Sequence, residues 1–130
     1  MIIDSSAILA VLRAEPRAEE IRAALLATPN VAISAGTLVE TTIVVDGRRD
    51  PVASARLDAL LRAIGPEVVP VDAAQAAIAR TAYRDFGRGS GHKAGLNFGD
   101  CFSYALAKER DEPLLYVGDD FARTDLASVL

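Results

Sequence analysis

Several acidic side chains lie at points where a predicted strand ends or a predicted helix begins, far apart along the chain. They are Asp4, Glu40, Asp100, Asp119 and Asp120. Carboxylates that gather at one point repel each other and raise each other's pKa unless a divalent ion lies among them. Oxygen ligands without a cluster of His or Cys are typical of Mg²⁺ or Mn²⁺ sites. The pattern therefore indicates a site for a hard divalent metal, provided that the fold brings these acids together.

Local structure offers a different role for most of these acids. Asp4 precedes "SSAIL" and can cap a helix there, a role worth about 1 kcal/mol. Asn97, with Asp100 three residues later, resembles a capping box, although Glu or Gln is more usual at the second position. "GDDF", residues 118–121, is typical of a polar turn. Taken singly, these explanations stay open, and only the convergence of the acids favours a metal site.

Glu40 is harder to explain by local structure. Its helix, "GTLVETTIVV", carries Ile43 and Val44 on the same face as Glu40 and further apolar residues on the opposite side. No Lys or Arg lies within a turn of it. A carboxylate on such a helix is costly unless a cation or hydrogen bonds satisfy it. The remaining alternative is a helix edge that reaches solvent.

The elements that must position the acids alternate between strands and helices. Strands are expected at 1–4, 31–34, 67–71 and 113–118, and helices at 5–15, 16–28, 35–49, 51–65, 72–87 and 96–109. This order predicts an α/β/α sandwich with a mainly parallel central sheet of four to five strands, folded as a single domain over residues 1–130. Ligands bind such sheets outside the carboxyl ends of the strands, and Asp4, Asp72 and the Asp119–Asp120 pair each follow a strand.

Composition narrows the classes of function. The 130 residues are 51% hydrophobic and carry a net charge of −4, whereas a protein that binds nucleic acid through its overall field should be basic. A nucleic-acid role therefore requires metal ions or a local basic patch. One Cys excludes an internal disulfide and a Cys-rich zinc site. We see neither a signal peptide nor an apolar run of roughly 20 residues, and expect a cytoplasmic protein without membrane contact.

The local basic patch lies in "YRDFGRGSGHKAG", just before the 96–109 helix. It supplies four side chains that could follow a phosphate backbone, namely Arg84, Arg88, His92 and Lys93. The alternative is a solvated loop whose charge is incidental.

Other motifs fail on their context. "GSGHKA" matches a dinucleotide-binding pattern, but a helix precedes it rather than a strand. His92 is the only histidine, so the sequence offers no basis for a His-based zinc site or a Ser-His-Asp triad. Cys101 is far more typical of a packed core than of a nucleophile. A receiver domain or a haloacid-type phosphatase would need a second acid beside Asp4, where Ser5 and Ser6 stand instead.

The chain resembles the PIN-domain ribonucleases, and within them the VapC toxins of bacterial toxin–antitoxin pairs. The matching stretches are "IIDSSAILAVL", "LVET", "LNFGDCFSYALAKE" and "PLLYVGDDF", which follow the family's order and spacing over nearly the whole chain. Many relatives have Thr-Asn-Asp where Val117 and Gly118 precede the final acids here, so this chain departs from the family pattern at the fourth acidic position.

The resemblance implies a Mg²⁺-dependent endoribonuclease, with Mn²⁺ as an alternative ion, that acts as the toxin of a type II system on a structured RNA. It implies that Asp4 and Asp100 hold the metal and that Glu40 and Asp119 complete the catalytic acids. Ser6 would help to order the site, and Asp120 competes with Asp119 for the fourth position.

The same resemblance implies a cognate antitoxin that inserts Arg or Lys into the acidic groove, and a homodimer formed through the helices at 16–27 and 35–47. Hydrolysis by metal-activated water would leave 5′-phosphate and 3′-hydroxyl ends. The alternative is a related PIN-like module that binds RNA or protein without cleaving it. Such a module would normally have lost a site acid, and none is missing here.

Overall fold

A parallel sheet of four short strands lies at the centre of the computed structural model, which describes residues 1–130. The strands are β1 (Ile2–Ile3), β2 (Ala32–Ser34), β3 (Glu67–Val69) and β4 (Leu114–Leu115), in the order β3-β2-β1-β4. Every pairing is parallel, with Ile2 opposite both Ala32 and Leu114. The predicted α/β class and parallel sheet are confirmed, with four strands.

Six helices connect and cover the strands, as the sequence predicts. They are α1 (Ser5–Leu12), α2 (Ala18–Ala27), α3 (Ala35–Asp46), α4 (Pro51–Ile64), α5 (Ala73–Phe86) and α6 (Asp100–Arg110). A short 3₁₀ helix, Phe121–Arg123, follows β4. The last long helix begins at Asp100 rather than at 96, because residues 97–99 form the turn that caps it. No helix is both long and apolar enough to cross a bilayer.

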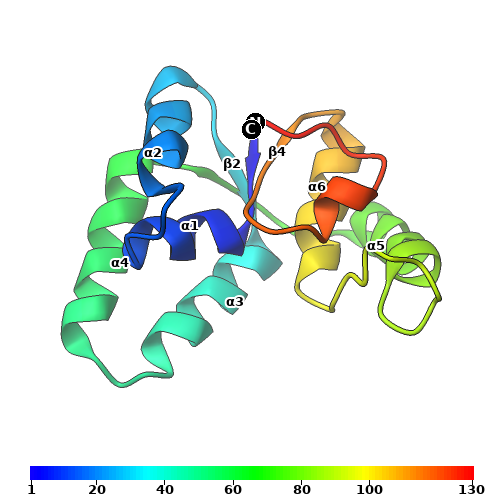
Figure 1. Cartoon of the computed structure of the whole chain (residues 1–130), viewed down its shortest axis with the longest axis horizontal. Helices are drawn as coiled ribbons and strands as arrows, with labels where there is room; N and C mark the ends of the chain where they lie inside the picture. Colours follow the sequence, from blue (N-terminus) through cyan, green and yellow to red (C-terminus); the bar gives the residue numbers. More distant parts are fainter.

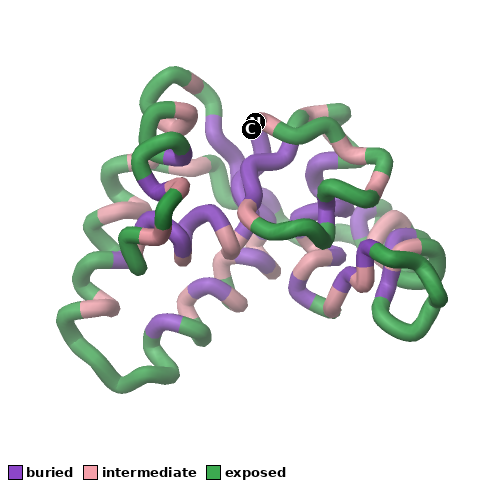
Figure 2. The backbone as a smooth tube through the Cα atoms, in the orientation of Figure 1, coloured by how far each residue is buried: buried purple, intermediate pink, exposed green.

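Two hydrophobic clusters form the core on the two sides of the sheet. The side chains of Ile2 and Ile3 belong to different clusters, because successive residues of a strand point to opposite faces. Helices α1, α2 and α4 lie to one side of the sheet, and α5 and α6 to the other (Figure 1). The buried stretches run through the strands at the centre, while the outer turns of the helices are exposed (Figure 2).

The strand order creates a crevice at the carboxyl end of β1. The chain proceeds outward from β1 to β2 and β3, and then returns to place β4 on the other side of β1. Ligand sites in parallel sheets form where the order reverses in this way. The segment after β4 therefore meets the residue that follows β1, which is Asp4.

Helix α3 packs closely against α6, and this contact brings two further acids to the same crevice. A Cβ atom added to Gly36 would lie 2.5 Å from the Phe102 ring, so only glycine fits at that point. Glu40 lies one turn after Gly36 on α3, and Asp100 begins α6.

Candidate functional site

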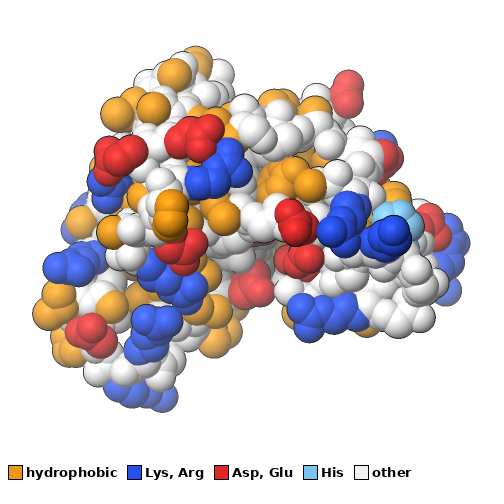
Figure 3. Space-filling view, viewed as in Figure 1, with side chains coloured by type: hydrophobic (Ala, Val, Ile, Leu, Met, Phe, Trp, Pro, Cys, Tyr) orange, Lys and Arg blue, Asp and Glu red, His pale blue; other side chains and the backbone are white.

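Acidic side chains from four separate segments line one cavity of about 280 Å³ at the carboxyl end of β1. The acids in its wall are Asp4, Glu15, Glu40, Asp100 and Asp120, joined by Ser5, Ser6, Arg13 and Asn97. In Figure 3, acidic side chains lie around the hollow in the middle of the face shown. The expected convergence of Asp4, Glu40 and Asp100 on one cavity is therefore present.

Asp4 is held in a fixed orientation by three hydrogen bonds. It caps α1, and its Oδ2 accepts from the Ser6 backbone N–H at 2.9 Å and from the Ser6 hydroxyl at 2.6 Å. Its Oδ1 accepts from the Ser103 hydroxyl at 2.6 Å. The residue is only 2% exposed. Asp4 therefore caps α1 and lines the cavity at the same time. Its Oδ1 accepts only one hydrogen bond and keeps a lone pair that could bind a cation.

The hydroxyl groups around Asp4 belong to a longer hydrogen-bonded chain. Thr37 Oγ1 lies 2.9 Å from Ser103 Oγ, and both residues are fully buried. Since the single Ser103 proton goes to Asp4, Thr37 must be the donor in this contact. On the other side, the Ser6 hydroxyl accepts from the Val117 N–H at 3.0 Å. Helices α3 and α6 and the segment after β4 are therefore all tied to Asp4.

Asp100 also combines a capping role with a place in the cavity. Its Oδ2 accepts from the Asn97 N–H at 2.7 Å, and its own N–H donates to Asn97 Oδ1 at 3.0 Å. This is the reciprocal capping box expected from the sequence. Burial raises the pKa of Asp100 to about 6; the Asn97 hydrogen bond opposes the shift, and the charges of Asp4, Asp120 and Glu40 add to it.

Glu40 carries an unsatisfied carboxylate oxygen. Its Oε2 is buried and has no hydrogen-bond partner. Burial raises the pKa of Glu40, the nearby Asp4 charge raises it further, and the Ser5 side chain opposes the shift. The Glu40 carboxylate lies against the backbone of Gly99, where an added Cβ atom would collide with it. The expectation that Glu40 needs a cation is consistent with this geometry.

The structure distinguishes the two acids of the "GDDF" turn. Asp120 lines the cavity and its charge acts on Asp100. The Asp119 side chain is 85% exposed and lies 4.0 Å from the Arg123 guanidinium, outside the cavity. Asp72, which also follows a strand, caps α5 by accepting from the Gln75 N–H and does not line the cavity. Of the two acids in this turn, Asp120 rather than Asp119 is therefore the one that the fold brings to Asp4, Glu40 and Asp100.

The donor set fits a divalent ion that is only partly coordinated by protein. No group of three or more Asp, Glu, His or Cys side chains is arranged to hold a metal ion by itself, so the carboxylates do not form a closed cage. Mg²⁺ commonly takes one or two carboxylates and keeps several waters. The free lone pair of Asp4, the open Oδ1 of Asp100 and the orphaned Oε2 of Glu40 are oxygen donors of that kind.

The predicted basic patch is exposed, and its charges are partly engaged. Arg84 pairs with Asp85 at 2.8 Å, and Arg88 donates to the Gly95 carbonyl at 3.3 Å. His92 packs edge-on against Phe86 and accepts from the Ala94 N–H. None of the four predicted side chains lines the acidic cavity, although Asn97, at the end of the same loop, does. Basic side chains flank the histidine in Figure 3.

Sequence reasoning missed the two buried hydroxyls, Ser103 and Thr37. Each lies three residues from a site acid on the same helix face, Thr37 before Glu40 and Ser103 after Asp100. A hydroxyl at that spacing in an otherwise apolar helix was the available signal. Cys101, expected to be core, is buried, and burial raises the pKa of its thiol to about 11, so it stays protonated at neutral pH.

Comparison with known families gives a match over nearly the whole chain. The model of the PIN domain family matches residues 1–126. "Ribonuclease VapC28" of Mycobacterium tuberculosis is 52% identical over 130 residues, covering 100% of this chain and 98% of the relative. "Ribonuclease VapC" of Mycolicibacterium smegmatis is 46% identical over 129 residues, covering 99% of each chain.

Solved structures show the same fold at lower sequence identity. VapC20 of Mycobacterium tuberculosis, described as a sarcin-ricin loop cleaving toxin, superposes with a TM-score of 0.73 at 20% identity, covering 98% of this chain and 97% of that one. FitAcB of Neisseria gonorrhoeae superposes with a TM-score of 0.72 at 23% identity, covering 98% and 94%. At these identities the likeness concerns the fold alone.

Proposed function

The chain belongs to the PIN domain family, among its VapC ribonucleases, and on that premise we propose that it is a metal-dependent endoribonuclease, the toxin of a type II toxin–antitoxin system. The observation that carries the proposal is the cavity in which Asp4, Glu40, Asp100 and Asp120 meet. A non-cleaving PIN-like module would not need to maintain these acids in one cavity against their mutual repulsion.

Mg²⁺ is the proposed ion, with Mn²⁺ as a substitute, and Asp4 and Asp100 are its proposed protein ligands. When bound, such an ion lowers the pKa of water and offsets negative charge on phosphoryl oxygens. The Ser6 and Ser103 hydroxyls keep Asp4 oriented, and the Asn97 cap keeps Asp100 oriented. Both carboxylates are therefore already oriented, so that binding the ion costs little further side-chain conformational entropy.

Glu40 is proposed to orient the attacking water and to accept its proton. Its raised pKa and its orphaned Oε2 make it a better proton acceptor than a solvated carboxylate. Asp120 would hold further water around the ion. The attack does not use the ribose 2′-hydroxyl, so the products would carry 5′-phosphate and 3′-hydroxyl ends.

The proposed partners are a structured RNA substrate and a cognate antitoxin, in the cytoplasm. The acidic cavity suits an antitoxin segment that inserts Arg or Lys among the carboxylates. The proposed RNA contacts beside the site are the side chains of the 84–93 patch, namely Arg84, Arg88, His92 and Lys93. A homodimer through α2 and α3 is also proposed, because Leu26 is 90% exposed, Val39 56% and Ile43 64%.

Cleavage of total cellular RNA by the purified chain, with the ends mapped, tests the proposed function. We expect cleavage at few sites with Mg²⁺ or Mn²⁺ and none with EDTA. Fragments should accept ligation at their 5′ ends without prior phosphorylation. Cleavage that continues in EDTA, or fragments with 2′,3′-cyclic phosphates, would show a different mechanism.

A further inference from the structure

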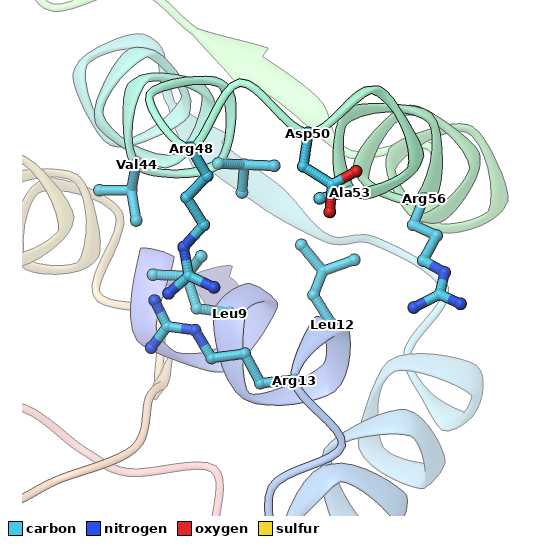
Figure 4. A pocket seen from close by; sticks show the side chains of 9 residues that line it. Leu9, Leu12, Arg13, Val44, Arg48, Asp50, Ala53 and Arg56 are labelled. Carbon is cyan, nitrogen blue, oxygen red and sulfur yellow. The ribbon is translucent and has the colours of Figure 1, made fainter.

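A second cavity lies between α1, α3 and α4, on the side of the sheet away from the 84–93 loop. Its floor consists of apolar side chains, among them Leu9, Leu12 and Ala53, and its rim carries Arg13, Arg48 and Arg56. In Figure 4, the guanidinium groups of Arg13 and Arg48 lie together over Leu9, and Arg56 extends from α4 at the other side of the opening.

These three arginines are poorly neutralised by the protein. Arg48 and Arg56 form neither an ion pair nor a side-chain hydrogen bond, and Arg13 approaches only Glu15, at 3.7 Å. Asp50, the one acid in the cavity wall, already accepts from the Val52 N–H at 2.9 Å as the cap of α4. Three cations therefore gather on a chain whose net charge is −4.

The ends of two helices lower the cost of placing these arginines together, but they do not identify a ligand. Arg13 caps the C-terminus of α1, and Arg48 follows the C-terminus of α3 by two residues, where the negative end of the helix dipole favours a cation. Nevertheless, neither guanidinium has a hydrogen-bond acceptor within the protein, and Arg13 only approaches Glu15 at 3.7 Å. Two arginine heads held side by side create a point where an anion would relieve their repulsion.

This basic cavity adjoins the acidic one. Leu9 and Arg13 line both, so the two openings share a wall formed by α1. A ligand that spans them must carry negative charge beside the arginines and still be able to lie against carboxylates that hold a cation. A strand of phosphodiesters meets both demands, because its phosphates pair with arginine forks and with a metal ion.

We propose that Arg13, Arg48 and Arg56 bind phosphates of the RNA strand where it leaves the acidic site over α1. This extends the proposed function, since it names the path of the substrate beyond the cut bond. The path lies on the side of the crevice away from the 84–93 patch, so the RNA would cross the crevice and be held on both sides of it. The apolar floor between the arginines provides a surface on which a ribose or base can rest.

Binding of a 5′-fluorescein-labelled 12-nucleotide oligouridylate in EDTA, where no cleavage occurs, tests this proposal. Each phosphate contact on a single strand contributes about 0.7 to the slope of log K against log salt concentration. We expect the double variant Arg48→Gln/Arg56→Gln to reduce this slope by about 1.4 and to weaken binding at least tenfold at 0.1 M NaCl. The matched control, Arg22→Gln/Arg62→Gln, removes the same charge from helices α2 and α4 outside the cavity and should bind like the parent.

The outcomes separate this proposal from the proposed function. If the parent cleaves RNA and the Arg48/Arg56 variant keeps the parent slope, the phosphate path is wrong while the nuclease stands. If binding depends on these arginines but the parent cleaves no RNA with Mg²⁺, the path stands without the nuclease. A labelled oligoglutamate peptide is the competing ligand. If it binds the parent more tightly than the RNA does, and the double variant no longer binds it, the cavity belongs to an acidic protein segment instead. Circular dichroism establishes that each variant is folded.

Discussion

The Ser103 hydroxyl donates a 2.6 Å hydrogen bond to Asp4, which lies 99 residues earlier in the chain. Thr37, on a third element, donates to Ser103 in turn. This buried chain of hydroxyls fixes the carboxylate that the proposed mechanism uses as a metal ligand. It therefore gives α3 and α6 a direct influence on the geometry of the site.

We predict that Ser103→Ala lowers RNA cleavage at least tenfold through kcat, and lowers the free energy of unfolding by about 1–3 kcal/mol. A hydrogen bond to a charged group is lost and Thr37 is left without an acceptor. Thr37→Val should cost less, because the Ser103–Asp4 bond remains. Thr41→Val on the same helix is the control: its hydroxyl donates to the Thr37 carbonyl and does not reach Asp4. An equal loss of cleavage in the Thr41 variant would refute the positioning role.

Replacing the proposed ligands should separate folding from activity. Asp100→Asn keeps an oxygen that can accept the Asn97 N–H and removes a buried charge that its neighbours repel. We expect cleavage to fall by at least about a hundredfold, a few kcal/mol of transition-state stabilisation. Without metal, thermal unfolding should occur at the parent temperature or above it. Full activity of Asp100→Asn and of Asp4→Asn with Mg²⁺ would disprove the nuclease assignment.

The two acids of the "GDDF" turn give a paired test. Asp120→Asn should weaken the stabilisation of the protein by Mn²⁺, measured as a shift of the unfolding temperature, and should lower cleavage. Asp119→Asn should change neither, because the Asp119 side chain is 85% exposed and faces Arg123. The reverse result would return Asp119 to the site.

The close contact between Gly99 and Glu40 predicts an interaction between two substitutions. Gly99→Ala should lower cleavage and destabilise the protein by about 1 kcal/mol, because its methyl group displaces the Glu40 carboxylate, which is the end of a flexible side chain and can move. In the double variant Glu40→Ala/Gly99→Ala the clash disappears, so stability should recover while cleavage stays low. Unfolding in urea measures the interaction energy. Additive losses of stability would mean that the two residues do not touch.

Asp125 provides a dependence of stability on pH that is remote from the site. Its carboxylate accepts from the Tyr104 hydroxyl and from Lys108, each at 2.6 Å, and the Lys108 and Tyr104 contacts lower its pKa. A lowered pKa in the folded state means that the stabilisation is present above the unfolded value, about 3.9, and is lost as the pH falls below it. Because the Lys108 and Asp125 side chains are about half exposed, the contribution is about 1 kcal/mol or less.

Asp125→Asn should therefore unfold at a lower temperature than the parent at pH 6, and the difference should shrink towards pH 3. Asp111→Asn is the control, because Asp111 is the C-cap of α6, the helix that carries Tyr104 and Lys108, and has a left-handed backbone conformation that Asn adopts readily. A constant difference between Asp125→Asn and the parent from pH 6 to pH 3 would exclude ionisation of Asp125 as its cause.

Periodicity and strand alternation predicted all six long helices and the parallel sheet, because each element carries its own apolar pattern. Local sequence also marked the acids as candidates for the site, because Asp4 and Asp120 follow strands and Glu40 has no local partner. The choice between Asp119 and Asp120 depended on a turn in which Gly118 has a φ of +109°, and composition does not specify which side chain such a turn directs inward.

The Ser103–Thr37 contact and the arginine cavity could not be predicted from the sequence, for a different reason. Ser103 and Thr37 are 66 residues apart and meet only because Gly36 lets α3 approach α6. The arginines come from the ends of α1 and α3 and from α4, and their relation to the acidic cavity depends on the wall that the two cavities share at Leu9. Both features depend on how helices pack, which local patterns do not encode.

The position of β1 between β2 and β4 has a consequence for when the protein becomes active during synthesis. The N–H of Asp4 donates to the Leu115 carbonyl, and Ser6 accepts from Val117, so the first strand stays uncovered on one edge until the last fifth of the chain leaves the ribosome. A nascent chain cannot assemble its acidic cavity before then. The connectivity thereby shields the translating ribosome and its message from a nuclease that is still being made on them.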